Sequence, residues 1–124
     1  GGKIVAIYTR NEELGSKLAV EFSTNSFSDV DSLLKSDVDI VIEAATIEAA
    51  KEYAIKVLEG RKNLVLSSIG VMVDTAFEES VREVCTRNNV NVFLPSGAIG
   101  GLDILKSAKA VNGLESVSIT TRKP

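Results

Sequence analysis

Histidine and tryptophan are absent from this sequence of 124 residues, and cysteine occurs once, as Cys85. Without histidine, the chain by itself can form no Ser-His-Asp triad, no Cys-His pair and no histidine metal site. A single cysteine excludes an internal disulfide and a cysteine-rich metal site. Acid–base chemistry near neutral pH would therefore need a carboxylate, lysine or tyrosine with a shifted pKa.

Excess charge of one sign and long apolar runs are also lacking. The balance of 14 basic and 17 acidic residues gives a net charge of −3, so we expect neither nucleic acid nor an anionic membrane as partner. No apolar run approaches the ~20 residues of a membrane span, and no signal peptide is recognised. Cys85, on an apolar helical face, is predicted to be a buried small hydrophobe. Together these features predict a cytoplasmic protein.

What the sequence does contain is an alternation of short apolar segments and amphipathic segments. Buried strands are predicted at residues 3–9, 38–45, 63–68 and 91–94, and a half-exposed strand at 114–123. Helices are predicted at residues 11–22, 46–60, 75–88 and 102–111, with one or two helical turns at 29–36 and loops at 23–28 and 69–74.

The helix ends carry recognisable capping residues. Asn11 and Thr46 are predicted N-caps, Gly60 closes its helix, and Thr75 with Glu78 has the form of a capping box. The repeated β-α order predicts an α/β fold, a doubly wound, Rossmann-like parallel sheet of about five strands with helices on both faces. We expect residues 1–124 to form a single dinucleotide-binding domain.

Ligands of such sheets bind outside the carboxyl ends of the strands, which directs attention to four segments. These segments read YTRN (8–11), EAAT (43–46), SSIG (67–70) and PSGAIGG (95–101). In the first, the Thr9 hydroxyl and the Arg10 guanidinium suit the 2′-phosphate of NADP, where an NAD site usually has a carboxylate. The alternative is that Arg10 is a solvated loop residue.

The second segment combines small side chains with a helix start. Ala44 and Ala45 would let a flat ligand approach the backbone, and Thr46 opens a helix whose free N–H groups favour an anion. Glu43 is either part of this site or hydrogen-bonded locally. Tyr8 and Tyr53 carry no feature that marks them as catalytic.

The remaining two segments have weaker signals. Ser67 and Ser68 offer hydroxyls, as many α/β loops do. The glycines Gly97, Gly100 and Gly101 have neither the spacing nor the position of a dinucleotide fingerprint, which follows the first strand as Gly-Xaa-Gly-Xaa-Xaa-Gly. They either allow a ligand close to the backbone or let the next helix pack tightly.

Four segments in order, IVAIYTRN, DIVIEAAT, LVLSSIG and FLPSGAIGGLD, followed by ITTRKP, resemble the NAD(P)-dependent L-aspartate dehydrogenase family. The resemblance implies an oxidoreductase that converts L-aspartate with NAD or NADP to iminoaspartate, which hydrolyses to oxaloacetate and ammonia. It also implies cofactor contacts along the cleft, from the adenosine ribose to the nicotinamide, at Thr9, Arg10, Ala44, Ala45, Ser67, Ser68, Ser96, Gly97 and Ala98.

The chain departs from that family in three respects. The first strand with its glycine fingerprint is missing, and so is the C-terminal domain that supplies the catalytic histidine after TTRKP. Thr9 stands where many members have aspartate, which argues against strict NAD specificity and is compatible with NADP. We therefore expect the full-length protein to be an enzyme with L-aspartate as its small-molecule substrate. In these 124 residues alone we expect no catalytic residue, no metal and no turnover. The sequence is also compatible with a full-length enzyme that forms a homo-oligomer.

The missing strand has a physical consequence, because the first strand is central in the sheet order 3-2-1-4-5-6. Its absence would separate the two halves of the sheet, so three alternatives stay open: the given chain omits part of the molecule, another segment fills the gap, or the sheet is rearranged. Alternatives to this interpretation are the Rossmann domain of another two-domain dehydrogenase, and a non-catalytic α/β nucleotide-binding module or engineered fold fragment.

Overall fold

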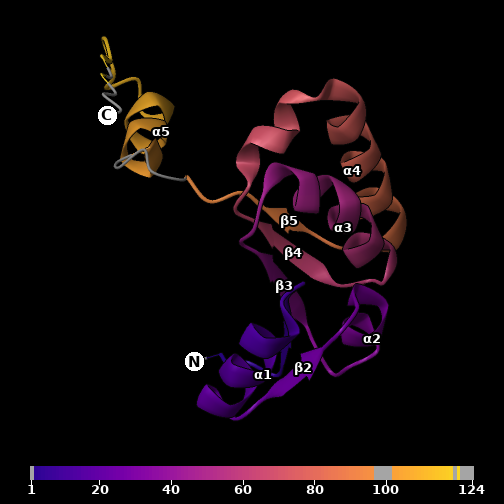
Figure 1. Ribbon diagram of the computed structural model, residues 1–124. Helices are drawn as coiled ribbons and strands as arrows, with labels where there is room; N and C mark the ends of the chain where they lie inside the picture. Colours follow the sequence, from indigo (N-terminus) through magenta and orange to yellow (C-terminus); the bar gives the residue numbers. More distant parts are fainter. Residues whose placement is uncertain (1, 97–101, 119, 121–124) are drawn as a thin grey trace.

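The computed structural model describes residues 2–96, 102–118 and 120 (Figure 1). Within these residues there are five strands: β1 (Ala6–Tyr8), β2 (Asn25–Phe27), β3 (Ile40–Glu43), β4 (Asn63–Leu66) and β5 (Val92–Phe93). The helices between and after them are α1 (Glu12–Glu21), α2 (Val30–Leu34), α3 (Ile47–Glu59), the 3-10 helix η1 (Ile69–Val73), α4 (Thr75–Asn88) and α5 (Leu102–Ala110). Every strand pairing is parallel, which confirms the predicted α/β class and strand number.

The strands form two sheets rather than one. β1 pairs with β2, placing Ile7 opposite Ser26, while β3, β4 and β5 form a separate sheet in that order. Neither β1 nor β3 pairs with a further strand within the described residues. The described strands therefore lie in two separate parallel sheets.

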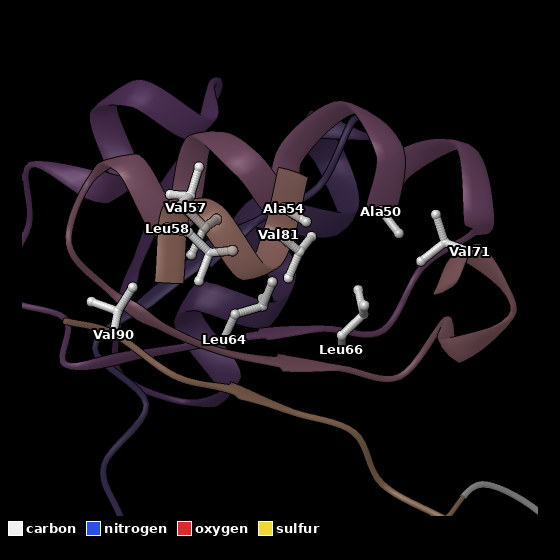
Figure 2. Packing of buried hydrophobic residues seen from close by; sticks show 10 residues of the cluster. Ala50, Ala54, Val57, Leu58, Leu64, Leu66, Val71, Val81 and Val90 are labelled. Carbon is white, nitrogen blue, oxygen red and sulfur yellow. The ribbon is translucent and has the colours of Figure 1, made fainter. Parts of the chain in front are cut away.

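The core lies between the larger sheet and two helices. Leu64 and Leu66 of β4 are fully buried and point toward the helix-covered face of the sheet, in one cluster with Ala50, Ala54 and Leu58 of α3 (Figure 2). Val81 and Val84 of α4 complete the same cluster. This arrangement follows from the alternation along β4, which sends every second side chain to the helix-covered face.

The opposite face of this sheet carries an apolar row. Ile42, Val65 and Phe93 stand side by side in the register of β3, β4 and β5. Ile42 is 67% exposed and Phe93 50% exposed. Helix α5 lies apart from both sheets (Figure 1), with Ile104 exposed to solvent.

The helix starts agree with the predicted caps at two of three positions. The Asn11 side chain accepts a hydrogen bond from the Leu14 N–H at 2.9 Å, and Thr46 caps α3 in the same way. The predicted capping box at Thr75 is wrong by one residue. Asp74 is the N-cap of α4, and its carboxylate accepts from the Phe77 N–H.

Four further local predictions need correction. Residues 23–28 were predicted as a loop, but Asn25–Phe27 form β2, because pairing with β1 stabilises a segment too polar to show a strand pattern. The described part of 114–123 forms no strand, and the predicted loop at 69–74 contains η1. Cys85 packs against the core while only half-buried, and burial raises the pKa of its thiol.

Candidate functional site

A cavity of about 560 Å³ opens between β1 and β3. Its mouth is formed by residues that directly follow these two strands. They are Thr9, Arg10 and Asn11 after β1, and Ala44 and Ala45 after the last residue of β3, Glu43. Four of the predicted cofactor contacts therefore meet at one mouth, at the carboxyl ends of strands where Rossmann-like sheets bind ligands.

The β1 side of the mouth is ordered by the start of α1. The Thr9 hydroxyl accepts a hydrogen bond from the Asn11 N–H at 3.3 Å, and Asn11 in turn caps the helix. Arg10 is exposed at the surface beside them. Because Thr9 is fixed next to the helix start, its hydroxyl and the Arg10 side chain are presented at the same edge of the cavity.

The β3 side of the mouth is the start of α3. The pKa of the Glu48 carboxyl is lowered by hydrogen bonds from its own N–H and from the Thr46 hydroxyl, and to a smaller degree by the Arg10 charge. Arg10 therefore interacts electrostatically with the first turn of α3 across the mouth. The positive end of the α3 dipole and the Arg10 guanidinium both favour an anion here, while Glu48 opposes one.

Glu43 connects the ends of β3 and β4. Its carboxylate accepts hydrogen bonds from the Ala45 N–H at 2.8 Å, the Ser68 N–H at 2.9 Å and the Ser68 hydroxyl at 2.9 Å. The backbone carbonyl of Glu43 also accepts from the Ser67 N–H. These bonds hold the loop after β3 and the loop after β4 in place. Of the two interpretations of Glu43, the structure favours a residue that is hydrogen-bonded locally.

The other predicted contacts are not brought to this mouth. Ser67, Ser68 and Ser96 do not line the cavity, although Ser68 is linked to it through Glu43. Gly97 and Ala98 lie outside the described residues. Their assignment to the nicotinamide end of a cleft stays a prediction.

Two tyrosines that sequence reasoning did not select line the cavity. The hydroxyls of Tyr8 on β1 and Tyr53 on α3 are 3.1 Å apart, and their rings meet edge-on with centroids 5.5 Å apart. The hydrogen bond with Tyr8 is the main cause that raises the pKa of Tyr53. The one available signal was helical spacing, since Tyr53 follows the buried Ala49 and Ala50 on the inward face of α3.

Two negative findings apply to the part of the chain that the structure describes. No group of three or more cysteine, aspartate or glutamate side chains is arranged to hold a metal ion there. None of the helices in that part has the length and apolar character to cross a membrane.

Comparison with known proteins yields one family and a consistent set of relatives. A family model described as the NAD-binding domain of homoserine dehydrogenase matches residues 1–95. The L-aspartate dehydrogenase of Methanocaldococcus jannaschii is 36% identical over 98% of this chain and 45% of its own length. That of Methanothermobacter thermautotrophicus is 38% identical over 98% of this chain and 47% of its own length. The chain thus spans less than half the length of these two relatives.

Solved structures give the same result for the fold. The aspartate dehydrogenase of Thermotoga maritima is 30% identical, with a TM-score of 0.59, over 89% of this chain and 52% of that protein. The WlbA dehydrogenase of Bordetella pertussis, solved with NADH and UDP-GlcNAcA, has a TM-score of 0.73 over 89% of this chain and 34% of that protein. At 17% identity it shows the fold alone. The Rossmann-like class and the resemblance of this domain to L-aspartate dehydrogenase are confirmed.

Proposed function

Because the chain belongs to the family of homoserine dehydrogenase NAD-binding domains, we propose that it is the cofactor-binding domain of an L-aspartate dehydrogenase. The observation that carries the proposal is the mouth of the cavity, where Thr9, Arg10, Ala44 and Ala45 meet. Relatives named L-aspartate dehydrogenase, 36% and 38% identical over 98% of the chain, support this substrate over other small molecules.

The residues at the mouth suit the adenosine end of a nicotinamide dinucleotide. Thr9 and Arg10 would bind the ribose and its substituent, and the small side chains of Ala44 and Ala45 leave the backbone accessible to a flat group. A hydroxyl and a guanidinium suit the 2′-phosphate of NADP, and the first turn of α3 adds a favourable dipole. We therefore propose NADP as the preferred cofactor.

The nicotinamide end belongs to the loops after β4 and β5. We propose that Ser67, Ser68, Ser96, Gly97 and Ala98 line it. The two hydrogen bonds that Ser68 donates to the Glu43 carboxylate support this, since they hold the loop after β4 in one position relative to the mouth.

The whole protein would oxidise L-aspartate by transferring a hydride to the nicotinamide, after which the imine hydrolyses to oxaloacetate and ammonia. The cofactor supplies the hydride acceptor, and the domain described above binds and orients it. Catalytic residues would come from outside residues 1–124, so the chain alone is expected to bind cofactor without turnover.

Cofactor binding is tested by calorimetry of the 124-residue chain with NADP, NAD and ADP. Loss of a charge-assisted hydrogen bond predicts that Arg10→Ala weakens NADP binding roughly 10-fold or more and NAD binding far less. Lys17→Ala, which removes an exposed positive charge on α1, is the matched control and should leave both affinities unchanged. Preference for NAD, or an unchanged NADP affinity in Arg10→Ala, would overturn the NADP assignment.

Substrate choice is tested on the polypeptide that carries this domain together with its catalytic part. We expect NAD(P) reduction with L-aspartate to exceed that with other L-amino acids and with sugars. A stronger response to another substrate would identify a different two-domain dehydrogenase. Absence of any response, with nucleotide binding intact, would identify a non-catalytic nucleotide-binding module.

A further inference from the structure

A second cavity, of about 250 Å³, lies at the amino ends of β1 and β2. It is lined by residues 3–5, which lead into β1, by residues 23–25 at the start of β2, and by residues 36–37 after α2. Because β1 and β2 are parallel, this end of the smaller sheet is opposite to the mouth, where Thr9 follows β1. The second cavity is therefore separate from the proposed cofactor site.

The lining of the second cavity is mostly polar and carries charges of both signs. Lys3 supplies an ammonium group and Asp37 a carboxylate, and both residues are exposed. Among the described residues, neither of them forms an ion pair. The other polar residues of the lining are Ser23, Thr24, Asn25 and Ser36. A ligand in this cavity thus meets two charges of opposite sign that the protein does not pair with each other.

The segments around the second cavity offer different hydrogen-bonding groups. The Ser36 hydroxyl donates its proton to the Leu33 carbonyl at 2.6 Å, so the lone pairs of its oxygen are left for a ligand. The carboxylate of Asp37, the next residue, is also an acceptor, whereas the ammonium group of Lys3 is only a donor. The cavity therefore has acceptors on the segment after α2 and a charged donor on the segment before β1.

Thr24 adds an unsatisfied group to the lining. Its hydroxyl oxygen is buried and has no hydrogen-bond partner among the described residues. Buried hydroxyls usually have such a partner, because the loss of hydration is otherwise uncompensated. Rotation about χ1 between staggered positions redirects a threonine hydroxyl. A polar ligand in the cavity that Thr24 lines can therefore give this hydroxyl the partner that it lacks.

The two unpaired charges select the kind of ligand. An anion would be repelled by Asp37 and a cation by Lys3, whereas a zwitterion places each of its charges beside the opposite one. Size restricts the choice further. At about 30 Å³ for each water of the liquid, the cavity has room for about eight non-hydrogen atoms. An α-amino acid with a short side chain has this size and both charges.

We propose that the second cavity is a binding site for a free α-amino acid with a short side chain. Lys3 and the Thr24 hydroxyl bind its carboxylate. Asp37 and the Ser36 oxygen accept hydrogen bonds from its ammonium group. The site does not depend on the proposed cofactor, because the two cavities share no lining residue within the described part of the chain.

Binding is tested by NMR titration of the isotope-labelled 124-residue chain with L-alanine. We expect saturable shifts at the amides of Asn25 and Asp37, while the amide of Ala45 at the mouth stays unchanged. Two matched ligands each lack one charge, since N-acetyl-L-alanine has no ammonium group and L-alaninamide has no carboxylate. Both should bind roughly tenfold more weakly or worse, because each loses a charge-assisted hydrogen bond.

Substitutions test the two charged contacts. Lys3→Ala and Asp37→Asn should each weaken L-alanine binding roughly tenfold or more. Lys35→Ala and Asp39→Asn are the matched controls, because they remove the same charges from exposed positions nearby in the sequence that do not line the cavity. Both controls should leave the affinity unchanged. Circular dichroism reports whether each variant is folded.

Thr24→Val separates a binding role from a structural one. Valine lacks the buried hydroxyl that has no partner, so this variant should unfold at a higher urea concentration than the wild type. It should also bind L-alanine roughly fivefold more weakly, because one hydrogen bond to the ligand is lost. Lower stability with unchanged affinity would show that Thr24 has only a structural role.

Three results would overturn the proposal. The first is the absence of saturable shifts at Asn25 and Asp37. The second is N-acetyl-L-alanine or inorganic phosphate binding as tightly as L-alanine, which would identify an anion site. The third is wild-type affinity in folded Lys3→Ala and Asp37→Asn variants, which would place the ligand elsewhere. L-alanine binding without nucleotide binding would support this inference while counting against the proposed function.

Discussion

The two halves of the molecule differ in how they bury apolar surface. In the larger half, formed by β3, β4, β5, α3 and α4, helix α3 alone buries five residues, among them Val57 and Leu58. In the smaller half, formed by β1, α1, β2 and α2, helix α1 buries only Gly15. Since buried apolar area is the main source of stability, the larger half is expected to unfold last and the smaller half to open first.

The cause of this difference is the space between the halves. Leu14 and Leu18 on α1 line the cavity, so this part of the helix's apolar face is not covered by other side chains. Leu14 is 45% exposed as a result. The helix has a proper N-cap and a helical pattern, which shows that good local signals do not by themselves produce burial.

The largest effect is expected from deleting a core side chain of the larger half. Leu58 on α3 is fully buried against the sheet. The substitution Leu58→Ala should therefore lower the free energy of unfolding by about 2–5 kcal/mol. The matched change Leu14→Ala, at a half-exposed position where α1 lines the cavity, should cost less than about 1 kcal/mol. Urea unfolding followed by circular dichroism measures both, and equal losses would contradict the comparison.

A smaller effect is expected at the junction of β3 and β4. The Glu43 carboxylate accepts three hydrogen bonds. In Glu43→Gln, an NH₂ group replaces one carboxylate oxygen and cannot accept a hydrogen bond from the N–H groups around it. We expect a loss of about 1–3 kcal/mol and faster hydrogen exchange of the Ser68 amide. Glu13→Gln in the first turn of α1 is the control for the loss of charge, and an equal effect there would exclude the bridging role.

The contact between α1 and β2 gives a test within the smaller half. A Cβ atom at Gly15 would lie 2.6 Å from the Ser26 hydroxyl oxygen and 3.1 Å from a Thr9 methyl group. Gly15→Ala should therefore destabilise by about 1 kcal/mol, despite the better helix propensity of alanine. Adding Ser26→Ala should recover most of the loss in a double-mutant cycle, and additive losses would show that this contact is not the cause.

The smallest effect is expected from the tyrosine pair that links the halves. Tyr53→Phe removes the hydrogen bond with Tyr8 and should reduce stability by about 0.5–1.5 kcal/mol at pH 7. The folded state raises the pKa of Tyr53 above its ordinary value of 10.0, mainly through that hydrogen bond. This contribution is fully present below pH 10 and is lost as the pH rises through the raised pKa.

The pH dependence supplies the check on the tyrosine pair. The difference in unfolding free energy between the wild type and Tyr53→Phe should stay constant up to pH 10 and shrink as the pH rises above 10. Tyr8→Phe, which removes the same bond from the other side, should give the same loss at pH 7. A constant difference across this range would show that the phenol of Tyr53 has the same pKa in the folded and unfolded states.

Much of the fold followed from local signals. The apolar runs around β3 and β4, and the helical periodicity of α3 and α4, lie close to their predicted positions, because burial of one helix face leaves a regular pattern. Part of the site was also predictable, from the positions of the predicted strand ends. Thr9, Arg10, Ala44 and Ala45 immediately follow strands, and parallel strands bring their carboxyl ends to one edge.

What the sequence by itself determined is therefore the order and type of most elements, the caps at Asn11 and Thr46, and the resemblance to a dehydrogenase domain. Tertiary structure alone decided that the polar segment Asn25–Phe27 forms a strand, that Glu43 holds Ser68, and that Tyr8 meets Tyr53. The physical reason is that helix periodicity and capping are properties of neighbouring residues. Strand pairing and side-chain contacts depend on partners up to 45 residues away, which leave no pattern in the local sequence.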